Sequence, residues 1–114
     1  MSRGLLVTRG AAFVQLRKPA EAHADAERAL KLAPADEAAA TLLASLLRAG
    51  GDTAHAVALL RSTLERAPQS IDLRRVLANI LIESGDLQGA EAQLVEAVKV
   101  RPDELALRYE LANF

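Results

Sequence analysis

Several residue types that carry chemistry or mark a cellular compartment are missing from this 114-residue sequence, or nearly so. It has no cysteine and no tryptophan, and only 3% of its residues are aromatic. The absence of cysteine excludes disulfide bonds, thiolate metal ligands and a thiol nucleophile. No apolar run approaches the ~18 residues of a membrane span, and the run Leu5–Val7 is too short for a secretory signal. We therefore expect a cytoplasmic protein, or a periplasmic one if a signal has been removed.

An excess of one charge is missing as well. Fourteen Lys and Arg residues face fifteen Asp and Glu residues, and the net charge is −1. A nucleic-acid-binding surface or an anionic-membrane surface requires clustered basic residues. We therefore expect no nucleic-acid partner and no membrane association.

The sequence repeats itself at a regular interval. Three of its four prolines, Pro34, Pro68 and Pro102, are equally spaced. Small residues recur with the same spacing at three further offsets, and so does a Gly-Asp pair at 51–52 and 85–86. A fixed period of about 34 residues is typical of stacked helical hairpins. The small residues are Gly10, Ala44, Ala78 and Ala112; Ala22, Ala56 and Ala90; and Ala29, Thr63 and Ala97.

Apolar residues between the turns recur with helical spacing, and no segment reads as a strand. Asp36, Asp52 and Ser70 are suitable N-caps, and the glycines at 51 and 85 suit left-handed C-caps. The pattern predicts an all-α fold with helices over 3–17, 20–33, 37–49, 53–66, 71–84, 87–100 and 104–113.

These features resemble the tetratricopeptide repeat family, whose units are helix–turn–helix hairpins of about 34 residues. The resemblance covers nearly the whole chain as one domain, with units at 3–36, 37–70 and 71–104 and a partial fourth at 105–114. It implies a right-handed α-α superhelix with a concave face. The first unit departs from the family pattern through Arg9 and the lack of a Gly-Asp turn, so we expect its helices to pack more loosely. A generic helical bundle would not require the period, and RNA-binding repeats of similar length would require a basic groove.

Candidate catalytic groups are few. His23 and His55 are expected to be surface histidines outside any metal site, and the acidic pairs Asp25/Glu27 and Glu91/Glu96 are expected to be solvated helix charges. No glycine-rich phosphate loop precedes a helix. We expect no enzyme activity, no metal and no cofactor.

The resemblance implies that first-helix positions line a groove for a partner protein or peptide. Several of these residues are short, and the others offer hydrogen bonds, positive charge and one aromatic ring. The candidate peptide-binding residues are Thr41, Ser45, Arg48, Arg75, Asn79, Tyr109 and Asn113.

Some family members hold the acidic C-terminus of chaperones through a set of Lys, Asn and Arg residues. The corresponding positions here are Val7, Ala11, Leu42, Asp72 and Val76 in one window, and Thr41, Ser45, Val76, Ala106 and Glu110 in the next. Neither window supplies the required cations, so we predict that such tails are not bound. The sequence thus favours a non-catalytic protein-interaction module. A regulatory or targeting segment of a larger enzyme and weak self-association through the terminal helices are the other two hypotheses.

Overall fold

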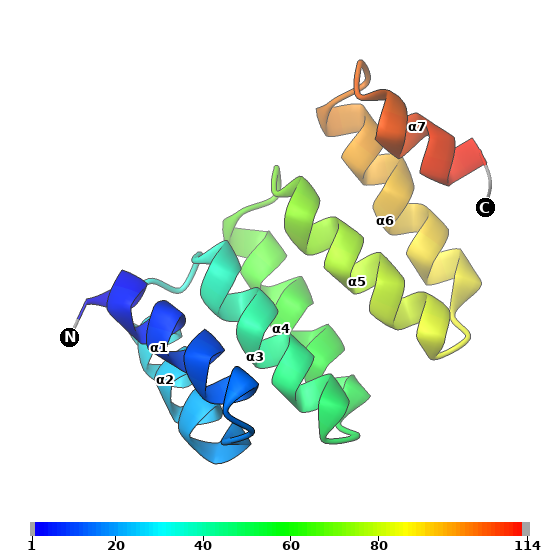
Figure 1. The fold of residues 1–114 in the computed structure, drawn as a ribbon. Helices are drawn as coiled ribbons and strands as arrows, with labels where there is room; N and C mark the ends of the chain where they lie inside the picture. The colour runs from blue at the N-terminus through cyan, green and yellow to red at the C-terminus, as the bar shows by residue number, and fades with distance from the viewer. Residues whose placement is uncertain (1, 113–114) are drawn as a thin grey trace.

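Residues 2–112 are described by the structure, a computed structural model, and they form seven α-helices. These are α1 Arg3–Gln15, α2 Pro19–Leu32, α3 Glu37–Ala49, α4 Thr53–Arg66, α5 Ile71–Glu83, α6 Leu87–Val100 and α7 Leu105–Ala112. The helices pack in sequence as pairs, α1 with α2, α3 with α4 and α5 with α6, while α7 packs on α6 (Figure 1). The all-α fold expected from the sequence is confirmed.

The helix bounds differ from the predicted ones by one or two residues at several ends. The first helix ends at Gln15 instead of 17, because Arg17 adopts a left-handed conformation with φ of 59°. The second begins at Pro19, whose fixed φ suits the first helical position. The fifth ends at Glu83, and the seventh begins at Leu105. Position 113 of the predicted last helix lies outside the described residues.

The turns repeat with the period of the sequence. Between helix pairs, the N–H groups of Asp36, Ser70 and Glu104 donate to carbonyls three residues earlier, at 3.0, 3.1 and 3.2 Å. Within the pairs, the N–H groups of Lys18, Asp52 and Asp86 each donate at 2.8 Å to a carbonyl five residues earlier. Gly51 and Gly85 supply the positive φ in two of these inner turns. The same local structure therefore recurs in each unit of the repeat.

The predicted N-caps are confirmed. The Asp36 carboxylate accepts from the N–H of Ala38 at 3.1 Å, and the Ser70 hydroxyl accepts from the N–H of Leu73 at 3.2 Å. Asp52 accepts from the N–H of His55 at 3.2 Å. Each cap satisfies one of the donors that the first helical turn leaves unpaired.

Small side chains lie where neighbouring helices approach closely. Ala22, Ala56 and Ala90 are fully buried, one in each second helix. A Cβ atom added to Gly10 would come within 2.8 Å of the end of the Leu42 side chain, so α1 and α3 approach closely there. The largest core cluster is built from α3 to α6, with Leu30 and Leu111 packed against it from the two ends.

The first helix pair corrects two expectations from the sequence. Asp25 is not a solvated helix charge, because its side chain is only 3% exposed and accepts two hydrogen bonds from Arg9, at 2.6 and 2.7 Å. The Arg9 guanidinium also lies 5.7 Å from the centre of the Phe13 ring. The pair is not loosely packed either, since Leu6 and Ala26 are buried within it. Arg9, a departure from the family pattern, thus holds α1 to α2.

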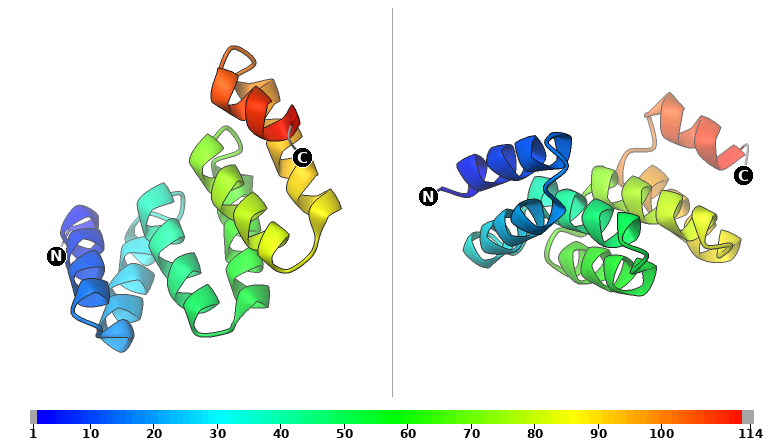
Figure 2. Two further views of the ribbon diagram at one scale, coloured as in Figure 1. Left: turned by 45° about the vertical axis from the view of Figure 1, so that its right-hand side comes forward. Right: turned by 60° about the horizontal axis from the view of Figure 1, so that its bottom comes forward.

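The helix pairs follow one another along the longest dimension of the molecule, which measures 40 × 26 × 22 Å. The helices α1, α3, α5 and α7 follow one side, and α2, α4 and α6 follow the other (Figures 1 and 2). In the second view of Figure 2, α1 and α7 rise at the two ends with α3 and α5 lower between them. The side formed by the first helix of each pair is therefore concave.

Candidate functional site

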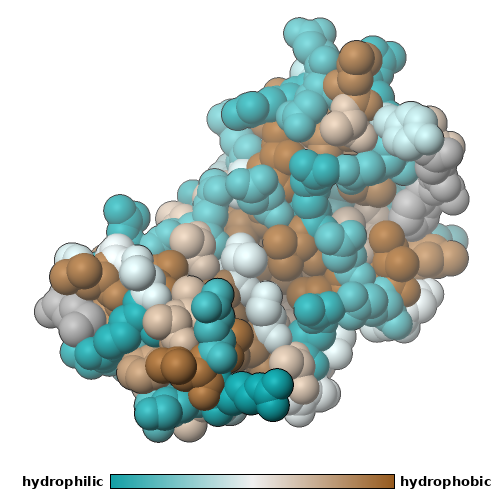
Figure 3. Space-filling model, in the orientation of Figure 1, coloured by the Kyte–Doolittle hydropathy of each residue, from teal (hydrophilic) through white to brown (hydrophobic). Residues whose placement is uncertain are grey.

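A large hollow lies on this concave side, along α1, α3 and α5. Its volume is about 1080 Å³, and we call it the main groove. The corresponding face shows apolar side chains exposed between charged ones (Figure 3). The residues that line the main groove are Arg3, Val7, Ala11, Ala35, Asp36, Glu37, Ala38, Thr41, Leu42, Ser45, Asp72, Arg75, Val76 and Asn79.

Helical spacing places these side chains in the main groove. Thr41 and Ser45 are four residues apart on α3, and Arg75 and Asn79 are four residues apart on α5, so each pair shares one helix face. Short side chains at 41 and 45 leave open space above α3. The groove thus exists because these faces do not pack against another helix of the chain.

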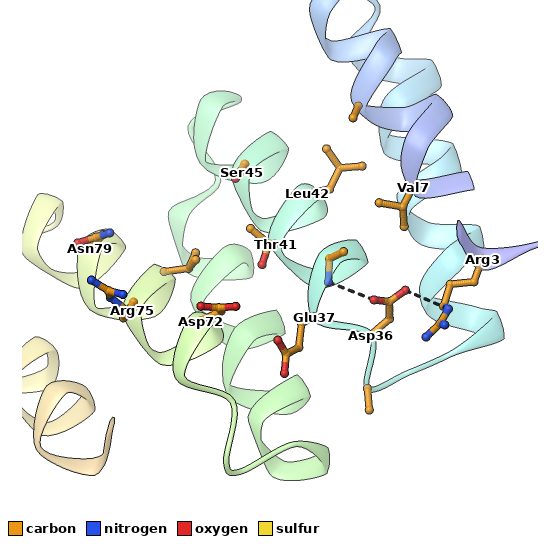
Figure 4. A pocket seen from close by; sticks show the side chains of 14 residues that line it. Arg3, Val7, Asp36, Glu37, Thr41, Leu42, Ser45, Asp72, Arg75 and Asn79 are labelled. Atoms are coloured by element: carbon orange, nitrogen blue, oxygen red, sulfur yellow. Dashed lines mark hydrogen bonds and ion pairs between the residues drawn. The ribbon is translucent and has the colours of Figure 1, made fainter. Parts of the chain in front are cut away.

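The floor of the main groove is apolar. Val7 comes from α1 and Leu42 from α3 (Figure 4), and Val76 comes from α5. All three residues are half-buried. Their remaining exposed surface is available to apolar groups of a ligand, whose burial contributes about 25 cal/mol for each Å² removed from water.

Two smaller hollows continue from the main groove towards the C-terminal end. One of about 390 Å³ lies between α3 and α5 and includes Arg48 and Glu83. The other, of about 400 Å³, lies between α5 and α7 and includes Tyr109 and Glu110. Asn79 lines all three hollows and stands at their junction.

Two of the candidate arginines already have intramolecular partners. Arg48 on α3 donates to the Glu83 carboxylate on α5 at 2.7 Å, and Arg75 on α5 pairs with Glu110 on α7. Each pair joins residues 35 positions apart and so links consecutive first helices. A ligand carboxylate would have to compete with these glutamates for either arginine.

The structure brings most of the predicted site residues together. Thr41, Ser45, Arg75 and Asn79 share the main groove, whereas Arg48 and Tyr109 line the two smaller hollows. Asn113 lies outside the described residues. Sequence reasoning missed part of the lining, although the recurring offset between arginine and glutamate was visible. The missed residues include Arg3, Asp36, Glu37, Leu42, Val76, Glu83 and Glu110.

The histidines lie outside the groove lining. His23 pairs with Glu27 at 2.6 Å, which corrects the expectation that neither histidine has an acidic residue four positions along its helix. His55 contacts the Asp52 carboxylate at 2.7 Å. A hydrogen bond from the His55 side chain, and to a smaller extent one from its backbone N–H, lowers the pKa of Asp52. The carboxylate of Asp52 is the N-cap of α4. Within residues 2–112, no group of three or more His, Asp or Glu residues is arranged to hold a metal ion. No helix of that region is long and apolar enough to cross a membrane.

The sequence matches models of a known protein family. Two models of the tetratricopeptide repeat match the chain, one over residues 7–71 and the other over residues 47–113. Each match by itself covers more than half of the chain. No curated protein matches the sequence.

Solved structures of the same fold include proteins of different roles. The chain is similar to YrrB, a tetratricopeptide repeat protein with an unusual peptide-binding site, with 20% identity, a TM-score of 0.76, and coverage of 96% of this chain and 57% of YrrB. It is similar to a Thermobaculum terrenum O-GlcNAc transferase, with 24% identity, a TM-score of 0.74, and coverage of 96% of this chain and 21% of the transferase. It is also similar to the first such domain of Spaghetti (RPAP3) bound to the HSP90 peptide SRMEEVD. The identity there is 14%, the TM-score is 0.78, and coverage is 98% of this chain and 89% of that one.

Proposed function

Because the chain belongs to the tetratricopeptide repeat family, we propose that it is a non-catalytic interaction module that binds a peptide segment of a partner protein in the main groove. The observation that carries this proposal is a hollow of about 1080 Å³ that crosses three consecutive first helices. The polar lining residues Thr41, Ser45 and Asn79 do not belong to the core, whereas Val7 and Val76 pack against core clusters and contribute to an apolar floor. Grooves of this composition suit an extended or helical peptide.

Asn79 and Tyr109 are the polar and aromatic contacts that we propose for the ligand. Asn79 is exposed at the junction of the three hollows, and its amide can donate to and accept from a peptide backbone. The Tyr109 side chain is 71% exposed and offers a rigid ring. Thr41 and Ser45 offer hydroxyl groups, while Arg48 and Arg75 can contribute only together with their glutamate partners.

A bulky neutral side chain in the groove tests this proposal. Peptides are selected on the immobilised protein from a random library, and their affinity is measured by fluorescence polarisation. Ser45→Tyr should weaken binding by about tenfold or more, which corresponds to about 1.4 kcal/mol, because the ring fills the space above α3. Ser62→Tyr introduces the same side chain at an exposed position of α4, outside the main groove, and should leave affinity unchanged.

The selection has two unfavourable outcomes. Equal affinity of the Ser45→Tyr variant and the wild type would place the binding site elsewhere on the molecule. Failure to enrich any peptide on the folded protein would contradict peptide binding itself. Circular dichroism of each variant verifies that the helices are retained.

A second candidate function is a regulatory or targeting segment of a larger enzyme. The similarity to part of an O-GlcNAc transferase, of which this chain covers 21%, favours it. Sequencing the complete reading frame tests it directly. A catalytic domain encoded in the same frame would support this candidate, and an open reading frame limited to helical repeats would contradict it.

A further inference from the structure

The charges of the groove are unequally compensated. The main groove and the two hollows that continue it contain three arginines, and each has a carboxylate partner: Arg3 with Asp36 at 3.6 Å, Arg48 with Glu83, and Arg75 with Glu110. Two further carboxylates, Glu37 and Asp72, line the main groove. Among the described residues, neither is part of an ion pair, so the groove keeps two negative charges without a cation.

These two carboxylates lie on neighbouring first helices. Glu37 is in the first turn of α3 and Asp72 in the first turn of α5, and both are exposed. In Figure 4 they stand between Asp36 and Arg75, on the same part of the groove wall. They also share a smaller adjoining hollow that is lined by a further carboxylate, Glu104, and by the cations Arg75 and Arg101. A cation in the groove at this end would therefore meet two negative charges.

Helix geometry alone also favours acidic residues at these positions, because the helix dipole stabilises a negative charge in the first turn. Glu21 satisfies the same preference in α2, where it is exposed and outside the main groove. If stabilisation of the helix start were the whole role of Glu37 and Asp72, replacing them would affect a ligand no more than replacing Glu21. This residue therefore provides a matched control.

We propose that the main groove selects a peptide carrying a lysine or arginine, whose charge lies against Glu37 and Asp72 while neighbouring apolar side chains contact Val7, Leu42 and Val76. This inference rests on the proposed peptide-binding function. A cationic side chain gains attraction from both carboxylates without breaking an existing ion pair. An acidic peptide meets two negative charges, and it gains an arginine of the main groove or of the two hollows that continue it only by displacing Asp36, Glu83 or Glu110. Like charges at an interface suppress the wrong partner.

Selection from a random peptide library tests the inference. Peptides of about 12 residues suffice, because an extended chain of that length spans the longest dimension of the molecule, 40 Å. Sequences enriched on the wild type should carry Lys or Arg beside Leu, Ile or Val. The double variant Glu37→Gln, Asp72→Asn should bind the best of these peptides at least about fivefold more weakly, whereas Glu21→Gln should bind as the wild type does. Affinity for the wild type should also fall as salt concentration rises, because salt screens exposed charges.

The possible results distinguish a failure of this inference from a failure of the proposed function. Enriched peptides that are acidic or show no charge preference would overturn the cationic inference and leave peptide binding intact. Unchanged affinity in the double variant would overturn it too. Absence of any enriched sequence would contradict the proposed function and the inference together. Repeating the selection on the double variant should yield apolar peptides without Lys or Arg enrichment, and persistent enrichment there would place the cation elsewhere.

Discussion

Arg17 occupies the turn position that glycine holds in the next two helix pairs. Its φ of 59° corresponds to 87° at Gly51 and 89° at Gly85, and the three residues stand one repeat apart. A left-handed conformation costs a non-glycine residue about 1–2 kcal/mol. The first inner turn therefore keeps the geometry of the others at the expense of backbone strain.

Replacing this arginine with glycine should stabilise the protein. We expect Arg17→Gly to raise the free energy of unfolding by about 1 kcal/mol, because glycine adopts positive φ without a Cβ clash. Arg61→Gly, at an exposed position inside α4, should instead lower it by about 1 kcal/mol. Urea unfolding followed by circular dichroism measures both, and a loss of stability in Arg17→Gly would show that its side chain has an unrecognised role.

The ionised Asp25 carboxylate makes the free energy of unfolding depend on pH in the acidic range. The hydrogen bonds from Arg9 hold the pKa of this carboxyl below its usual value, and burial opposes them only partly. A carboxyl with a lowered folded-state pKa stabilises the fold above its unfolded-state pKa, near 3.9, and loses that contribution as pH falls through the folded-state pKa. Asp25→Asn should therefore reduce stability at pH 7 and make little difference at the lowest pH.

Glu27→Gln is the matched control for Asp25→Asn. Glu27 lies two residues further along the same helix and is exposed, so its substitution should change the free energy of unfolding by less than about 0.5 kcal/mol. Unfolding curves recorded from neutral to acidic pH make the comparison. An Asp25→Asn deficit that stays constant with pH would contradict the ionic origin of its effect.

Helical spacing already separated Asp25 from Glu27, because Asp25 shares a face with the buried Ala22 and Ala29. The sequence did not show that Arg9 on the facing helix is the partner of this buried carboxylate. Arg9 was visible as a departure from the repeat pattern. Its meaning depends on which side chain faces it across the hairpin, and this requires the helix–helix geometry.

At the scale of the helices, close packing depends on the repeated alanines. Ala56→Leu should lower the free energy of unfolding by about 1–3 kcal/mol, because the larger side chain forces apart helices that meet at a fully buried methyl group. Ala58→Leu adds the same atoms at an exposed position of the same helix and should change stability by less than about 0.5 kcal/mol. Thermal unfolding measures both variants, and a tolerated Ala56→Leu would mean that the hairpin can widen.

Helix order, turn positions and caps were predictable, because each is set by local residue types that recur in register. Pro19, Asp36, Gly51 and Ser70 act through their own backbone or one adjacent turn. The links between consecutive helix pairs were not predicted. The contact of Arg48 with Glu83 joins side chains 35 residues apart, so it depends on how one hairpin is rotated against the next.

At the scale of the whole molecule, the negative charge of the main groove predicts that acidic peptides do not bind there. The HSP90 peptide SRMEEVD, which the RPAP3 domain holds, should give no binding heat in isothermal titration calorimetry with this protein. The groove arginines are paired with carboxylates of the protein, and Glu37 and Asp72 repel the acidic end of the peptide. The same peptide with lysine in place of its glutamates provides the comparison. A micromolar dissociation constant for the acidic form would contradict the prediction.

The concave face was predictable from the repeat, because first-helix positions that do not pack the core must share one side. The sequence did not show that the charges of this face that lack an ion-pair partner are negative. Sequence reasoning counted Arg48 and Arg75 as groove cations, and the structure shows each neutralised by a glutamate, Glu83 on α5 and Glu110 on α7. Charge at such a surface is a property of several hairpins together.

The ion pair between Arg9 and Asp25 also distinguishes the first hairpin from the other two. The equivalent residues are Leu43 and Leu59 in the second hairpin, and Leu77 and Gln93 in the third. If α1 were exchanged onto α4 during folding, Arg9 would face Leu59 and lose its carboxylate. Helices of similar repeats can pair with the wrong neighbour and leave the chain misfolded. An ion pair that only the native pairing of α1 with α2 forms disfavours such mispairing.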